Sequence, residues 1–188
     1  MESTKIIAPK RATLDDLMGI EGKAELIGGR IVRSMTGDQP SDVASEIFVS
    51  LRAYAKARSI GRARTDGVGY AVPELSSGRE SFSPDASYYL GPRPANRMRF
   101  IKGAPTFAVD VRSEGDHGSA AERTMAATRA DYFEAGTLVV WDVDPIASIV
   151  RSYRAVAPDH LTVFDPQDTA DAEPAVPGWR IDLADVFA

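Results

Sequence analysis

The stretch that decides the fold has three parts: TFAVDVRS (106–113), SAAERTMAATRADYFEA (119–135) and LVVWDV (138–143). The first and third are rich in β-branched and aromatic residues, and the third is typical of a strand buried on both faces. The middle part predicts a helix that opens with a capping box of Ser119 and Glu122 and ends at the following glycine. This order predicts two parallel strands joined by a right-handed helical crossover.

The rest of the chain predicts short elements with local connections, and therefore one α+β (mixed α/β) domain over 1–188. We expect a central mixed β-sheet flanked by helices. An acidic segment rich in alanine and proline, 166–178, is expected to be a loose loop. The remaining expected helices are 13–18, 42–59 and 182–187, and the expected strands lie within 24–35, 62–72, 81–90, 149–156 and 161–164.

Composition excludes several kinds of site. The 188 residues include no cysteine and two histidines, so a cysteine nucleophile, an iron–sulfur cluster and a three-histidine zinc site are all ruled out. No apolar run is long enough to span a membrane, and a cytoplasmic location is expected. The net charge of −5 divides into +4 over residues 1–102 and −9 over 103–188. Such a total is not that of a strongly basic nucleic-acid binder, although the first half could contact phosphates.

Asp110 is the unusual residue of the first apolar segment. Strand alternation places its neighbours Phe107, Val109 and Val111 on one face and directs Asp110 to the other, together with Arg112. A buried carboxylate is costly unless it is paired or binds a cation. Two explanations stay open: an ion pair between Asp110 and Arg112, or a divalent metal held between Asp110 and Asp85, which follows Pro84 in another predicted strand.

One face of the predicted helix should lie over this carboxylate. Ala121, Met125, Thr128 and Tyr132 recur at intervals of three and four, so this row is expected to pack against the sheet. In a metal-dependent nuclease, a lysine at the position of Thr128 could polarise a water molecule or stabilise charge on a phosphate. A lysine introduced at this position is therefore expected to raise metal-dependent DNA cleavage.

Several of these residues, in this order, resemble a known family. They are Glu25–Gly29, Pro84-Asp85, Asp110-Val111 with Ser113, Asp131-Tyr132 before Gly136, the WDVDP of 141–145 and the terminal DVF of 185–187. The set is similar to the bacterial Uma-type restriction endonuclease family within the PD-(D/E)XK nuclease superfamily. The resemblance covers most of the chain and implies a restriction-endonuclease-like core.

The resemblance also implies a cofactor, a partner and roles for particular residues. Mg²⁺ or Mn²⁺ would be held by Asp85 and Asp110, with Glu25 at the family's first-strand acidic position as a further ligand. DNA would be the substrate and partner, no membrane is involved, and a homodimer is left open. Where the family has a helix lysine this chain has Thr128. Arg112, at the lysine position of the ordinary motif, and Arg129, beside Thr128, are the candidate replacements, although arginine is a poor general base.

Three hypotheses follow. The first is a Mg²⁺-dependent endonuclease that hydrolyses DNA phosphodiester bonds and is impaired by the loss of the lysine. The second is a non-catalytic homologue that keeps the nuclease fold and binds DNA or a protein partner. The third is an unrelated α+β binding module whose carboxylates form structural ion pairs. Metal binding separates the third from the others, and metal-dependent cleavage separates the first from the second.

Overall fold

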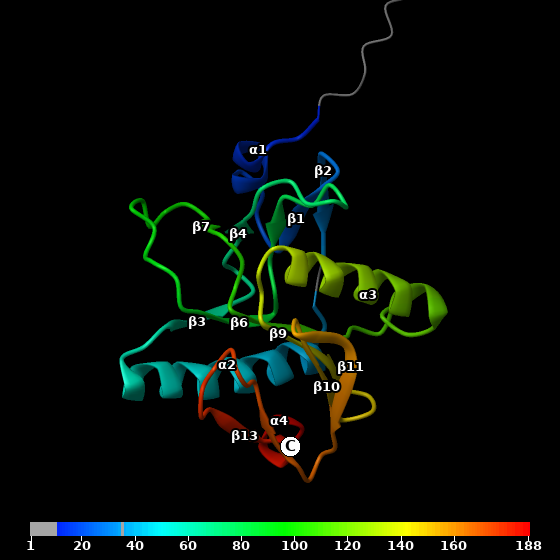
Figure 1. The fold of residues 1–188 in the computed structure, drawn as a ribbon. Helices are drawn as coiled ribbons and strands as arrows, with labels where there is room; N and C mark the ends of the chain where they lie inside the picture. The colour runs from blue at the N-terminus through cyan, green and yellow to red at the C-terminus, as the bar shows by residue number, and fades with distance from the viewer. Residues whose placement is uncertain (1–10, 35) are drawn as a thin grey trace, which may run out of the picture.

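The computed structural model describes residues 11–34 and 36–188, and a six-stranded mixed sheet lies at its centre (Figure 1). The strand order is β11-β10-β9-β8-β6-β3, and only β8 and β9 run parallel among these described neighbours. The strands are β3 Arg62–Thr65, β6 Ala86–Tyr89, β8 Phe107–Val111, β9 Val139–Asp144, β10 Ile149–Arg154 and β11 Ala157–Phe164. The expected α+β class with a central mixed sheet is confirmed.

The predicted β-α-β unit is present as β8, the helix α3 (Ser119–Glu134) and β9. Parallel pairing sets Asp110 directly beside Asp142. The predicted capping box is wrong, because the helix begins after Gly118, whose φ is 90°. Glu122 is bonded to the guanidinium of Arg112 instead, and a charge-assisted bond of this kind is stronger than a bond to a backbone amide.

Helices cover both faces of the sheet. Helix α2 (Asp38–Arg58) lies on one face and α3 on the other, as Figure 1 shows. The predicted alternation of β8 is confirmed, since Phe107 and Val109 belong to the core on the α2 side, while Ala108 packs with Tyr132 of α3 in a second cluster. The predicted inner row of α3 faces the sheet, with Tyr132 buried and Ala121, Met125 and Thr128 partly buried. Asp110 therefore projects toward α3.

Helix α2 begins four residues before the expected start. Its N-cap is Gly37, so Pro40 falls in the first turn. Proline is tolerated there because the first amides of a helix have no partner within it.

Two predicted strands are each divided. The segment 62–72 forms β3 and then β4 (Tyr70–Ala71), separated by a turn around Gly67. The segment 81–90 forms β5 (Ser81–Phe82) and β6, separated by Pro84, which has no amide hydrogen to donate to the ladder. Strands β4 and β5 join β7 (Ile101–Lys102) in a separate three-stranded sheet. Because of this division, Asp85 lies just before the first residue of β6, at the end of the large sheet rather than within it.

The C-terminal segment is more ordered than the sequence indicates. Residues 166–178, expected as a loose loop, contain β12 (Thr169–Asp171) and bury the side chains of Ala170 and Val176 completely. They pack on the α2 side of the core with β13 (Arg180–Asp182) and α4 (Leu183–Val186). Small apolar side chains fit this tight packing, so alanine here indicates burial rather than flexibility.

A small N-terminal layer completes the fold. It consists of helix α1 (Leu14–Met18) and a hairpin of β1 (Ala24–Ile27) and β2 (Arg30–Arg33). The predicted helix 13–18 is confirmed as α1, and it opens with a capping box formed by Thr13 and Asp16. Among the residues that the structure describes, no helix is both long and apolar enough to cross a membrane.

Candidate active site

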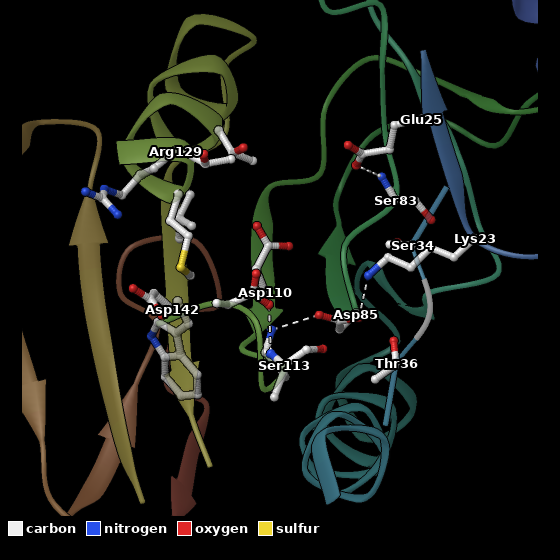
Figure 2. A pocket seen from close by; sticks show the side chains of 17 residues that line it. Lys23, Glu25, Ser34, Thr36, Ser83, Asp85, Asp110, Ser113, Arg129 and Asp142 are labelled. Atoms are coloured by element: carbon white, nitrogen blue, oxygen red, sulfur yellow. Dashed lines mark hydrogen bonds and ion pairs between the residues drawn. The ribbon is translucent and has the colours of Figure 1, made fainter. Parts of the chain in front are cut away.

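A pocket of about 230 Å³ lies between α3, the end of β8 and the segment that precedes β6 (Figure 2). Carboxylates, hydroxyls and one ammonium group converge on it from elements far apart in the sequence. Of the residues predicted for the site, the pocket is lined by Glu25, Asp85, Asp110, Thr128 and Arg129. Arg112 does not line it.

Asp85 is held at the pocket by the backbone of β8. Its amide donates to the carbonyl of Val109 at 2.9 Å, and its Oδ2 accepts from the amide of Val111 at 2.8 Å. The carboxylate thus takes the place of a backbone partner at the end of the ladder. Its Oδ1 accepts from Nζ of Lys23 at 2.5 Å. The side chain is 7% exposed, so it is fixed with one oxygen toward the pocket.

Asp110 is the second carboxylate of the pocket, and its environment disfavours its charge. Burial raises the pKa of Asp110 to about 7, and the negative charge of Asp85 adds to the effect. The hydroxyl of Tyr132 donates to Oδ1 at 3.2 Å, and the Tyr132 ring stacks on Phe82 at a centroid distance of 4.2 Å. The charge of Asp85 therefore acts on Asp110 within the same pocket, as the metal hypothesis requires.

Lys23 is a site residue that the sequence did not reveal. It precedes β1, and its side chain, 16% exposed, reaches into the pocket beside Asp85, as Figure 2 shows. Burial lowers the pKa of Lys23, but the charges of Asp85, Asp110 and Glu25 outweigh that effect and raise the pKa above its ordinary value. A positive charge is thus held among three carboxylates. The only signal in the sequence is that Lys23 and Glu25, two residues apart, share one face of an extended segment.

Glu25 lies in the same pocket, but both of its oxygens are already engaged. Oε1 accepts from the amide of Ser83 at 2.8 Å, and Oε2 pairs with the guanidinium of Arg79. Arg79, which the sequence also did not reveal, is 5% exposed and is bonded through Nε to Asp131 at 2.8 Å. These contacts join β1, the segment before Asp85, and helix α3, and so set the shape of the pocket.

Arg112 projects toward α3 as predicted but serves the structure elsewhere. It makes two bonds of 2.6 Å to the carboxylate of Asp142 and a third of 2.5 Å to Glu122. The expected alternative of an ion pair between Asp110 and Arg112 is therefore wrong, because Asp142, directly beside Asp110, takes the guanidinium in a bidentate arrangement.

The two helix candidates differ in their contacts. Oγ1 of Thr128 accepts from Nη2 of Arg79 at 3.3 Å. Arg129 lines the pocket with its stem, but its guanidinium lies over the ring of Tyr153, 3.6 Å from the centroid. Figure 2 shows this group directed away from Asp85 and Asp110. The guanidinium groups of Arg112 and Arg129 therefore do not reach the carboxylates of Asp85 and Asp110.

The donor set suits a hard cation. Mg²⁺ is commonly bound through one or two carboxylates while it keeps several water molecules. Asp85 and Asp110 provide two carboxylates, and Lys23, bonded to Asp85, shows that the pocket accommodates a positive charge. Within residues 11–34 and 36–188 no three acidic or histidine side chains lie close enough together for a metal cluster. Glu25, Asp116 and Asp142 also line the pocket, but they accept hydrogen bonds from Ser83 and Arg79, from Ser113 and from Arg112 respectively. Asp85 and Asp110 are therefore the better candidates for metal ligands.

We expect the stability of the metal-free protein to report on Asp110. Its folded-state pKa lies above that of an unfolded chain. Between about pH 4 and pH 7 the folded protein keeps a proton that the unfolded chain has released, so the free energy of unfolding falls across this window as the pH rises. Asp110→Asn cannot ionise and escapes this loss. In urea unfolding with EDTA present, the free energy of unfolding of the variant should therefore increase relative to that of the wild type as the pH rises to about 7. A constant difference would contradict the assignment; exposed Asp159 provides the control Asp159→Asn.

Arg79→Met should destabilise the protein strongly. It would leave the carboxylates of Asp131 and Glu25 partly buried without their cation, and breaking a buried ion pair in this way costs about 3–5 kcal/mol. The control is Arg11→Met, because Arg11 pairs with Glu74 and Glu80 at the surface and such pairs contribute about 0–1 kcal/mol. Equal losses for the two variants in urea unfolding would show that the Arg79 network is not structural.

Comparisons with known proteins agree with this fold. The model of the family Uma2, described as "Putative restriction endonuclease", matches residues 12–184. A crystal structure from Anabaena variabilis ATCC 29413, described as "a putative nuclease belonging to DUF820", superimposes with a TM-score of 0.71. That chain is 22% identical, and the match covers 93% of this chain and 97% of the other. At this identity the likeness shows the fold. The search of curated proteins finds no match.

The family match spans nearly the whole chain and includes every residue of the pocket. The resemblance inferred from the sequence is thereby confirmed. The chain belongs to the Uma2 family of restriction-endonuclease-like proteins.

Proposed function

We propose that this protein is a Mg²⁺- or Mn²⁺-dependent endonuclease that hydrolyses phosphodiester bonds in DNA. The observation that carries the proposal is the convergence of Asp85 and Asp110 on one pocket, where burial and the charge of Asp85 make the charge of Asp110 costly and a bound cation would offset that cost. Membership of the Uma2 family supports the reaction class.

In this proposal Asp85 and Asp110 hold the metal, and Glu25 contributes by position. When bound, the metal supplies a Lewis acid for the phosphate and lowers the pKa of a water molecule. The backbone of β8 fixes Asp85, and Tyr132 orients Asp110 through its hydroxyl. Glu25 holds the amide of Ser83, one residue before Pro84-Asp85, and so keeps the turn that presents Asp85.

Lys23 provides the positive charge that the missing helix lysine would have supplied. Its ammonium lies 2.5 Å from Asp85 Oδ1 and reaches the pocket from the residue before β1 rather than from α3. A compact ammonium on a flexible stem can meet the charge that develops on a phosphate. Thr128, Arg112 and Arg129, the residues considered from the sequence for this role, are bonded or stacked elsewhere.

Plasmid nicking by the purified protein tests the proposal. We expect nicking in Mg²⁺ or Mn²⁺, none in EDTA, and none from Asp110→Asn with either metal. An active preparation in EDTA, or undiminished nicking by Asp110→Asn, would refute the metal role of the pocket. A wild type that binds DNA but cleaves none of it would favour the non-catalytic homologue.

A further inference from the structure

A second pocket, of about 440 Å³, is lined by arginines from two parts of the chain. It lies between β3, the turn after it and the segment 93–101, and we call it the arginine pocket. The pocket is lined by Arg64 of β3 and by Arg93, Arg97 and Arg99, and Phe100 forms part of its apolar wall. Among the residues that the structure describes, no aspartate or glutamate lines this pocket.

The arginines are close enough to repel one another. Burial lowers the pKa of Arg64, and the positive charges of Arg62, Arg93 and Arg97 lower it further. Arg99 has a carboxylate partner, Asp15, at 2.8 Å outside the pocket. Arg64, Arg93 and Arg97 gather positive charge in a pocket whose lining includes no acidic side chain. Such a cluster raises the free energy of the empty protein, and a bound polyanion relieves that cost. The chemistry of the pocket is therefore that of a phosphate site.

Shared wall residues connect the arginine pocket to the carboxylate pocket. A smaller pocket lies between them and shares Gly67, Gly69 and Phe100 with the first and Ser83 with the second. Gly69 is required here, because a Cβ at this position would lie 2.6 Å from the ring of Phe100. The arginine pocket and the carboxylate pocket thus flank a third pocket, which is also lined by Asp66 and which Ser83 separates from the site of Asp85.

We propose that the arginine pocket binds backbone phosphates of the DNA strand whose scissile phosphate enters the carboxylate pocket. This inference rests on the proposed function, and it assigns a contact outside the reacting centre. The charge of the arginine pocket complements a chain of phosphates, and the lining residues that connect it through the third pocket to Ser83 place it near the carboxylate pocket. Contacts of this kind position the nucleic acid without reading its sequence.

The test is fluorescence anisotropy of a labelled DNA duplex over a range of salt concentrations, in EDTA so that no turnover occurs. The double variant Arg93→Gln/Arg97→Gln is compared with Arg52→Gln/Lys56→Gln, which removes the same charge from exposed positions of α2. The first should weaken binding about tenfold or more and reduce the slope of log K against log salt by about 2. The second should match the wild type. Since Arg93 and Arg97 are exposed and their removal relieves repulsion with Arg64, the variant should unfold at the same temperature as the wild type or at a higher one.

Three results would overturn the inference. Equal losses of DNA affinity in both double variants would indicate an effect of overall charge alone, and no loss in either would indicate that the arginines do not contact DNA. Displacement of the duplex by inorganic phosphate at matched ionic strength would indicate a site for the free anion. The proposed function fails separately. A wild type that binds the duplex through the arginines but never nicks DNA with metal would retain this inference, whereas metal-dependent nicking with no effect of the arginine variant would retain only the function.

Discussion

Lys23→Met should lower metal-dependent DNA cleavage by about 10²–10³-fold, the range for removal of one transition-state contact. The variant loses the ammonium group that is bonded to Asp85 and also feels the charge of Asp110. Its affinity for Mn²⁺ should be equal to or higher than that of the wild type, because a competing positive charge has left the same carboxylates. The measurements are nicking rates at saturating metal and calorimetric Mn²⁺ titration.

The two readouts separate the roles that Lys23 could have. If the ammonium only fills the place of the cation in the metal-free protein, Lys23→Met will bind Mn²⁺ more tightly and cleave as fast as the wild type. Lys56→Met is the control, since Lys56 is exposed on α2 and should change neither readout. Lys23→Arg retains the charge on a larger planar group and should fall between the wild type and the methionine variant.

Asp85→Asn should abolish both cleavage and Mn²⁺ binding. An amide can still accept from the amide of Val111, so the backbone contact of β8 survives, but the charge that faces Lys23 and the proposed metal is lost. Loss of a single transition-state contact lowers the rate by about 10²–10³-fold. The expected fall in nicking is larger, because the variant loses both the metal and the orientation of the bound phosphate. Asp159→Asn, at an exposed position of β11, should leave both properties unchanged.

An Asp85→Asn variant that still nicks DNA at more than a tenth of the wild-type rate, a loss equivalent to about 1.4 kcal/mol, would contradict the metal role. If the variant binds Mn²⁺ normally but does not cleave, the metal site does not include Asp85. Circular dichroism at the assay temperature should show both proteins folded, so that loss of activity is not loss of structure.

The sequence predicted the central β-α-β unit because its signals are local. Strand alternation in 107–111 and the helical spacing of Met125, Thr128 and Tyr132 fix which side chains share a face. The structure confirms both, and they bring Asp110 under α3. The predicted cap of α3 fails because a tertiary contact decides it: Glu122 is bonded to Arg112 instead of capping the helix.

The residues that complete the pocket could not be predicted, because their partners are distant in sequence. Lys23 and Asp85 are 62 positions apart, and Arg79 and Asp131 are 52 apart. No periodicity links such pairs. Thr128 illustrates the consequence: the sequence suggested that a lysine there would restore activity, but the structure places the buried guanidinium of Arg79 beside it. Two cations would then compete for Asp131 and Glu25, so the structure argues against that expectation.

The central claim is that Asp85 and Asp110 together hold a divalent metal ion. A crystal of the protein soaked in Mn²⁺ and measured at the manganese absorption edge tests it most directly. The account predicts one anomalous peak in contact with both carboxylates, with Lys23 no longer bonded to Asp85. No peak in the pocket, with the Lys23–Asp85 ion pair intact at saturating Mn²⁺, would contradict it.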